Sequence, residues 1–246
     1  MRVLDLFSGI GGFSLGLERA GMRTVAFCEI DPFCRQVLRK HWPNVPIFED
    51  VRTLTNEQTG SVDLVCGGFP CQPFSIAGHR KGHEDSRNMV QPMLDIVREL
   101  EPAWFVGENV EGFIDLGLDA LCAALGNLGY STRVISLPAC SVGLPTMERH
   151  VWIVATTSSE RLERFWEITV QAIEDGTKKL QGSDPRGSDR WDLPEARLCG
   201  VGERVSRRVD RLRALGNAVD PAVPELLGLA MLEAHNGLIS RPAMKD

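Results

Sequence analysis

The chain has 246 residues, of which 43% are hydrophobic and 24% are charged, and its formal net charge is −6 at pH 7. This length suits one large domain, or one domain with a small appendage, and the composition excludes a disordered or fibrous protein. No apolar run approaches the roughly 20 residues that span a bilayer, and the opening MRVLDLF lacks a signal-peptide layout. We therefore expect a cytoplasmic protein without a membrane segment.

The seven cysteines are an odd number, and no two of them form a CxxC pair. Paired Cys and His spacings of the zinc type are also absent. We expect reduced thiols, no disulfide framework and no metal.

Apolar segments of strand character alternate with amphipathic segments of helix character along the first 156 residues. The expected strands are 2–7, 23–30, 62–68, 103–110, 131–137 and 150–156. The expected helices are 14–21, 31–42, 86–102, 118–130, 205–219 and 224–238. Asp31 can cap the second helix, with Pro32 at its first position. This alternation predicts an α/β fold, a Rossmann-like, doubly wound and mostly parallel sheet with helices on both faces.

Ligands of such sheets bind beyond the carboxyl ends of the strands, and several polar residues follow strands here. Gly9, Gly11 and Gly12 form a glycine-rich turn before a helix, which suits a nicotinamide, a flavin or S-adenosylmethionine, or is only a tight turn. Glu29 ends the next strand, where a carboxylate suits a ribose diol, and Asp50 could accept a hydrogen bond from an adenine amino group. Each carboxylate alone could equally be a cap or a surface charge.

The segment GGFPCQPFS, residues 67–75, places Cys71 between two prolines directly after a predicted strand. Each proline fixes its own φ and restricts the residue before it, so the loop should be stiff. A stiff loop at a strand end can hold a nucleophile or be an inert turn. Glu108 follows another strand, and a carboxylate beside a cysteine loop is what thiolate addition to a heteroaromatic ring requires.

The character of the chain changes after residue 157. Residues 157–196 contain one amphipathic helical stretch followed by a segment rich in Gly, Ser, Asp and Pro, which predicts a small irregular subdomain. Residues 197–213 then carry six arginines against two acidic residues. This excess could follow phosphates, and the alternative is a solvated helix face.

In order and spacing, these motifs resemble the cytosine-5 DNA methyltransferase family. The resemblance rests on DLFSGIGGFSLGL, FCEID, EDV, GGFPCQPFS, ENV and RLRALGNAV, and covers residues 1 to about 156 and about 197 to 230. A conjunction of this kind is specific, whereas a single motif is not.

The resemblance implies S-adenosyl-L-methionine as cofactor and double-stranded DNA as partner. It implies that Cys71 adds to carbon 6 of a flipped-out cytosine, which activates carbon 5 for methylation, and that Glu108 contacts ring nitrogen 3. The expected cofactor-binding residues are Phe7, Gly9, Gly11, Glu29, Asp50, Pro70, Asn217 and Val219.

One departure from the family lies before the last strand. The family typically shows Gln-x-Arg-x-Arg there, and its last arginine touches the flipped base, whereas this chain has PTMERH with Thr146, Glu148 and His150 at those places. His150 or its neighbour Arg149 could supply the missing donor, and impaired catalysis is the alternative.

The resemblance suggests three regions. Residues 1–156 would be the cofactor-binding catalytic domain, 157–196 a small target-recognition region, and 197–246 a DNA-contacting segment whose last helix returns to the catalytic domain. We expect a monomeric DNA methyltransferase of the kind found in restriction–modification. The alternatives are a tRNA-directed relative and a catalytically silent DNA- or cofactor-binding module, while an NAD-linked dehydrogenase fits poorly because the Gly-x-Gly-x-x-Gly spacing is missing.

Overall fold

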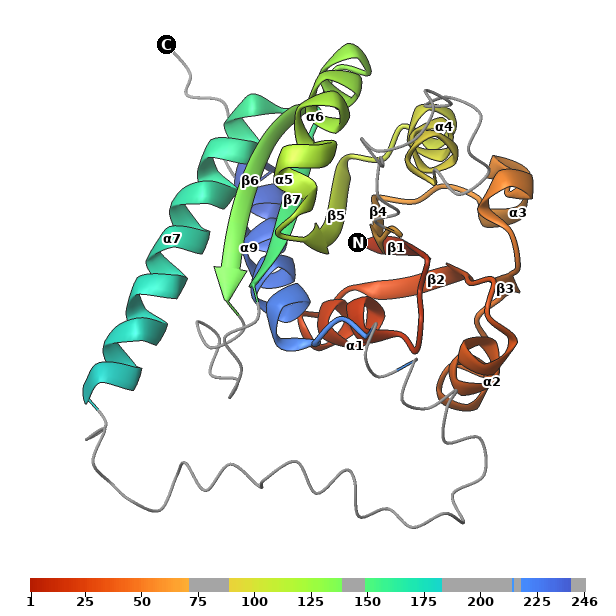
Figure 1. Cartoon of the computed structure of the whole chain (residues 1–246). Coiled ribbons are helices and arrows are strands. Elements are labelled where there is room, and N and C mark those ends of the chain that lie inside the picture. The colour runs from red at the N-terminus through yellow and green to blue at the C-terminus, as the bar shows by residue number, and fades with distance from the viewer. Residues whose placement is uncertain (71–88, 139–148, 183–213, 215–217, 240–246) are drawn as a thin grey trace.

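A seven-stranded sheet organises the protein, in the strand order β3-β2-β1-β4-β5-β7-β6 (Figure 1). The computed structural model describes residues 1–70, 89–138, 149–182, 214 and 218–239, with side chains placed up to 175 in the third range and 237 in the last. The strands are β1 (Arg2–Leu6), β2 (Arg23–Cys28), β3 (Ile47–Phe48), β4 (Leu64–Gly68), β5 (Trp104–Val110), β6 (Ser131–Pro138) and β7 (Arg149–Thr156). Strands β1 to β5 pair in parallel, and β7 pairs antiparallel with both β5 and β6. The prediction of a mostly parallel sheet is confirmed.

Helices cover both faces of this sheet. They are α1 (Gly12–Arg19), α2 (Pro32–His41), the 3-10 turn η1 (Val51–Thr53), α3 (Asn56–Thr59), α4 (Val90–Leu100), α5 (Phe113–Leu116), α6 (Leu118–Asn127), α7 (Ser159–Gly182) and α9 (Ala222–Ile239). In Figure 1, α5 and α6 lie in front of β6 and β7, and α9 lies behind them.

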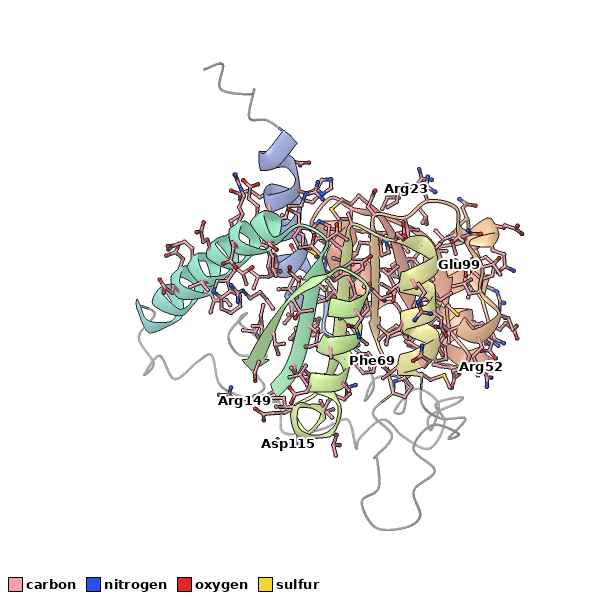
Figure 2. The ribbon with its side chains drawn as sticks, turned by 90° about the horizontal axis from the view of Figure 1, so that it is seen from above. Arg23, Arg52, Phe69, Glu99, Asp115 and Arg149 are labelled. Atoms are coloured by element: carbon pink, nitrogen blue, oxygen red, sulfur yellow. The ribbon has the colours of Figure 1, made fainter. Side chains whose placement is uncertain are left out.

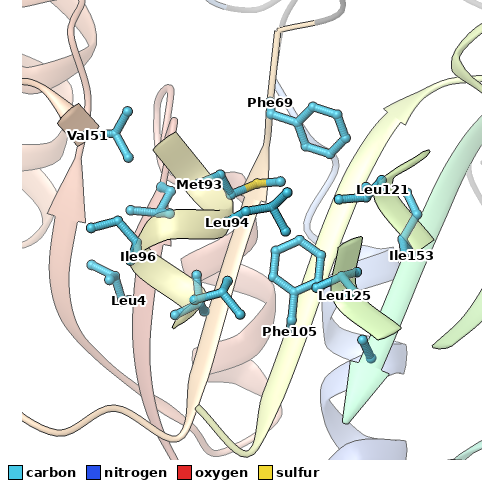
Figure 3. Packing of buried hydrophobic residues seen from close by; sticks show 14 of the residues in the cluster. Leu4, Val51, Phe69, Met93, Leu94, Ile96, Phe105, Leu121, Leu125 and Ile153 are labelled. Carbon is cyan, nitrogen blue, oxygen red and sulfur yellow. The ribbon is translucent and has the colours of Figure 1, made fainter. Parts of the chain in front are cut away.

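One apolar layer fills the space between the sheet and helices α4 to α6 (Figure 3). Met93 of α4 and Leu121 of α6 are almost fully buried there, against Phe105 of β5 and Ile153 of β7. The second layer joins the opposite face to α1, α7 and α9, and includes Trp104. Neighbouring residues of β5 supply the two layers because side chains alternate across a strand.

The longer described helices agree with the sequence prediction except at some ends, whereas the short helices η1, α3 and α5 are not predicted. The Asp31 side chain caps α2 by accepting hydrogen bonds from the backbone N–H groups of Phe33 at 2.7 Å and Cys34 at 3.3 Å, as expected. Helix α1 begins at Gly12, two residues earlier than predicted, because Gly11 in the left-handed region serves as its N-cap. The predicted helix 205–219 lies almost wholly outside the described residues.

Helix α7 lies where the small subdomain is predicted to begin. Its Leu162 and Phe165 are buried in the same apolar layer as Trp104 of β5, and the Phe165 and Trp104 rings meet edge to face with their centroids 5.8 Å apart. The first turns of this helix therefore pack on the main sheet. The three-region division remains a prediction for the residues that follow.

None of the helices in the described part of the chain is long and apolar enough to cross a membrane. Within those same residues, no group of three His, Cys, Asp or Glu side chains is placed to hold a metal ion.

Candidate functional site

The carboxyl ends of the parallel strands form one edge of the sheet, and most of the predicted site residues lie along it. Figure 2 shows Phe69, which follows β4, and Arg149, which begins the antiparallel β7, at this edge, whereas Arg23 at the start of β2 lies at the opposite edge. Because β7 runs antiparallel, its first residues lie beside the last residues of β5.

The buried Asp5 of β1 stabilises the glycine-rich turn that follows this strand. Asp5 is fully buried and accepts a hydrogen bond from the Ser14 hydroxyl at 2.7 Å, while the Ser8 hydroxyl donates to the Asp5 carbonyl at 2.6 Å. Burial raises the pKa of Asp5 from 3.8 to about 7. The turn is thereby fixed to both β1 and α1.

The backbone of this turn takes conformations that favour glycine. Gly9 and Gly11 have φ values of 54° and 92°, and Phe7 also lies in the left-handed region at 53°. A Cβ at Gly9 would meet no heavy atom of the described residues within 4 Å, so among these residues the backbone there is open to an approaching ligand. A non-glycine residue at positive φ is uncommon and marks local strain, which the contacts of Ser8 offset.

Glu29 joins the glycine-rich turn to the start of α2. Its side chain is buried, and its two oxygens accept hydrogen bonds from the backbone N–H groups of Gly9 and Asp31, each at 2.7 Å. A carboxylate oxygen has more than one acceptor site, so a ligand hydroxyl could still donate to this group. Glu29 is therefore a structural bridge as well as a candidate ligand contact.

Asp50 lies after β3, where its side chain caps η1. Its Oδ1 accepts from the backbone N–H of Arg52 at 3.0 Å, and its carboxylate also forms an ion pair with the Arg52 guanidinium at 2.5 Å. Hydrogen bonds from Arg52 lower the pKa of Asp50. The expected adenine acceptor thus already has a cationic partner.

The chain leading to Cys71 is anchored through Phe69. The buried side-chain amide of Asn109 donates to the Phe69 carbonyl at 3.1 Å, and the Phe69 ring packs edge to face on Phe113. Pro70 follows and is exposed. Cys71 itself, predicted as the nucleophile, lies outside the described residues.

Glu108 and His150 lie together at this edge. The Glu108 side chain is buried, and its Oε1 contacts Nδ1 of His150. Arg149, the other candidate donor, is exposed and pairs in register with Pro138 of β6. The structure therefore brings together one carboxylate and one imidazole from the predicted catalytic set.

Val219 lies between the glycine-rich turn and the end of β4. Its carbonyl oxygen would be 2.0 Å from a Cβ at Gly12, and its Cγ2 would be 3.6 Å from a Cβ at Gly68. The Glu108 Oε2 atom would be only 2.7 Å from the same Gly68 Cβ. The C-terminal segment thus reaches the site, although Asn217 is outside the described residues.

Several residues that shape this edge escape prediction from the sequence. Arg35 of α2 is buried and contacts Glu29, Ile30 and Glu49, and Asn109 anchors the loop before Cys71. Helical periodicity is the sequence signal that could have predicted the burial of Arg35, because this residue lies three positions before the buried Leu38 and next to the buried Cys34. Asp5 gives only the signal of an acidic residue inside an apolar strand.

The buried thiols of Cys28 and Cys66 are poor nucleophiles. Burial raises the pKa of Cys28 to about 12 and that of Cys66 well above its ordinary value, with nearby carboxylates adding to the effect. Thiolate is the reactive form of cysteine. Neither Cys28 nor Cys66 is therefore a candidate nucleophile.

Comparisons with known proteins find type II methyltransferases among the relatives of this chain. The chain is 36% identical over 165 residues to the type II methyltransferase M2.BsuMI of Bacillus subtilis, covering 63% of this chain and 42% of that protein. It is 34% identical over 171 residues to the type II methyltransferase M.HhaI of Haemophilus parahaemolyticus, covering 67% of this chain and 52% of that protein. The chain thus spans about half the length of these relatives.

A solved structure shares the fold. The Dnmt2 methyltransferase of S. pombe superposes with a TM-score of 0.56 at 26% identity, covering 63% of this chain and 50% of that one. The sequence profile of the C-5 cytosine-specific DNA methylases matches residues 1–198, which include every described strand of the sheet. With this match over most of its length, the chain belongs to the C-5 cytosine-specific DNA methylase family.

Proposed function

We propose that this protein transfers a methyl group from S-adenosylmethionine to carbon 5 of cytosine in double-stranded DNA, through a covalent Cys71 adduct on a flipped-out base. The observation that carries the proposal is the contact between Glu108 and His150, at the strand edge where Phe69 and Pro70 lead into Cys71. Family membership and the type II methyltransferase relatives support DNA as the substrate.

The donors and acceptors along the edge fit S-adenosylmethionine. Glu29 is an acceptor for the ribose hydroxyls, Asp50 is an acceptor for the adenine amino group, and the open backbone at Gly9 admits a close approach. Phe7, Gly11, Pro70, Asn217 and Val219 complete the proposed set. When bound, the cofactor supplies an electrophilic methyl group.

The protein side of the reaction is the activation of carbon 5. The Cys71 thiolate forms a bond to carbon 6 of cytosine, and Glu108 as the acid gives its proton to ring nitrogen 3, which leaves an electron-rich carbon 5. After methylation, a base removes the proton from carbon 5, the carbon–sulfur bond breaks to release the thiolate, and ring nitrogen 3 returns its proton to the Glu108 carboxylate. The ring must leave the duplex because its faces are inaccessible within the stack.

His150 takes the place of the family's last arginine in this proposal. It contacts Glu108, so it can orient the carboxylate and donate to the cytosine carbonyl as charge develops there.

A methyl-transfer assay tests this function. Purified protein is incubated with radiolabelled S-adenosylmethionine and either unmethylated DNA or tRNA, and bisulfite sequencing of DNA from an expressing host then identifies the modified cytosines. Label in DNA at carbon 5 supports the proposal. Label in tRNA alone would favour the RNA-directed alternative, and no transfer to either would favour the silent module.

A further inference from the structure

Arg35 joins the two loops that present the proposed ribose and adenine contacts. It is the one arginine classed as buried among the described residues, at 8% exposure. Its Nη1 donates to the carbonyl oxygens of Glu29 at 3.1 Å and Ile30 at 2.6 Å. Its Nη2 lies 3.0 Å from Oε1 of Glu49, the residue directly before Asp50.

Burial of the Arg35 guanidinium costs free energy, and other residues already hold α2 in place. A buried charge loses its hydration. The Arg35 Nε atom is buried and has no hydrogen-bond partner among the residues that the structure describes. Helix α2 already has the Asp31 cap and the buried Leu38 to hold it. What the guanidinium adds is a rigid fork that fixes two separate loops at once.

The Glu49 end of this contact is open to solvent. The Glu49 side chain is 68% exposed, whereas that of Arg35 is 10% exposed. Glu49 is therefore not a packing residue, and its interaction with Arg35 fixes the backbone just before Asp50. The two carbonyl contacts fix the backbone at Glu29 in the same way.

We propose that Arg35, acting through Glu49, is a positioning residue that sets the distance between the ribose acceptor Glu29 and the adenine acceptor Asp50, and so sets selectivity for adenine. This inference rests on the proposed use of S-adenosylmethionine. It adds to that function a residue that touches neither the cofactor nor the reacting atoms.

Calorimetry with two product analogues tests the proposal. S-adenosylhomocysteine carries the adenine amino group, and S-inosylhomocysteine has a carbonyl oxygen in its place. Wild-type protein should prefer the adenosyl ligand. Glu49→Gln should weaken adenosyl binding by roughly fivefold, because the amide oxygen accepts a weaker hydrogen bond from the guanidinium than the carboxylate does, and should leave inosyl binding nearly unchanged. Arg35→Lys, which loses the fork, should have the same effect or a larger one.

Glu163→Gln is the matched control. Glu163 is 60% exposed and pairs with Arg133 at 2.5 Å, joining α7 to β6 away from α2. This variant should bind both ligands as wild type does. Thermal unfolding of Glu49→Gln should match that of wild type, so that this variant decides the question even if Arg35→Lys fails to fold.

The outcomes separate this inference from the function beneath it. If wild-type protein binds neither ligand, the proposed cofactor is wrong and the inference falls with it. If wild type binds and Glu49→Gln has unchanged selectivity, or weakens both ligands equally, only the role of Arg35 is overturned.

Discussion

The imidazole of His150 contacts the carboxylate of Glu108 across the antiparallel pair of β7 and β5. His150 is in register with Val110, two residues beyond Glu108, so the two side chains are diagonal neighbours on one face of the sheet. Arg149 is one residue away, and its side chain belongs to the other face. Strand alternation therefore selects His150 rather than Arg149 as the partner of Glu108.

Substitutions of this pair should separate the two candidate donors. His150→Ala should lower the rate of methyl transfer by about 100-fold or more, as loss of a donor to developing charge does. His150→Arg should retain turnover because it restores the residue usual in the family. Arg149→Ala should change turnover little, and single-turnover kinetics on DNA measures all three.

Loss of turnover in Arg149→Ala together with full turnover in His150→Ala would show that Arg149, and not His150, is the donor. Full activity in both alanine variants would mean that a group elsewhere faces the cytosine oxygen.

The sequence predicts the parallel sheet and most helix positions because apolar periodicity and caps are local signals. Asp31 and Pro32 at the start of α2 show how a few residues can fix a helix end. The contact between Glu108 and His150 cannot be predicted from local signals, since the residues are 42 positions apart. The order of the motifs suggests that the two residues lie near each other, but the contact itself follows from the register of β5 and β7.

The backbone of Gly68 lies so close to the Glu108 carboxylate that no side chain fits between them, which yields a second prediction. A Cβ at Gly68 would lie 2.7 Å from Glu108 Oε2, so Gly68→Ala should displace the carboxylate. We expect slower methyl transfer with little change in cofactor affinity, measured by kinetics and calorimetry. Gly112→Ala is the control, since a Cβ there meets nothing within 4 Å and its φ is −60°. Equal activity of the two variants would argue against a carboxylate held at this place.

Glu29 and Glu108 should have separable effects. Glu29→Ala leaves the backbone N–H groups of Gly9 and Asp31 without their acceptor, so it should lower thermal stability and weaken S-adenosylmethionine binding by about 1.5–3 kcal/mol. Glu108→Gln should leave cofactor affinity unchanged and slow the chemical step, because an amide cannot protonate a ring nitrogen. Calorimetry showing the opposite assignment would mean that the two carboxylates exchange roles.

The buried Asp5 predicts a pH dependence of stability. Its pKa is about 7 in the folded protein against 3.8 ordinarily, so the folded state holds the proton more tightly. This contribution is fully present below about pH 4 and is lost as pH rises to about 7, with a slope of about 1.4 kcal/mol per pH unit. Asp5→Asn should flatten that decline.

Urea unfolding between about pH 3.5 and about pH 8, a range that includes this whole window, measures the difference in slope between wild type and Asp5→Asn. Asp95→Asn is the control, because Asp95 is exposed and pairs with Arg98 on the surface of α4. Identical slopes in wild type and Asp5→Asn would show that Asp5 remains ionised in the folded protein.

Other parts of the site carry only a weak sequence signal. Helical periodicity relates Arg35 to the buried residues of α2, but its contacts depend on where the Glu29 and Glu49 backbones lie in space. The motif of Asp50 suggests an adenine acceptor. Its ion pair with Arg52 depends on the η1 turn, which no periodic sequence pattern predicts. Contacts of this kind follow from tertiary structure.

The most direct test of the central claim is covalent trapping of the nucleophile. A DNA duplex containing 5-fluorocytosine at the methylated site is incubated with the protein and S-adenosylmethionine, since fluorine cannot leave carbon 5 as a proton does. Mass spectrometry of the digested complex should place the adduct on Cys71, and Cys71→Ser should give no adduct while still binding the cofactor. An adduct on any other cysteine, or wild-type turnover by Cys71→Ser, would contradict the mechanism.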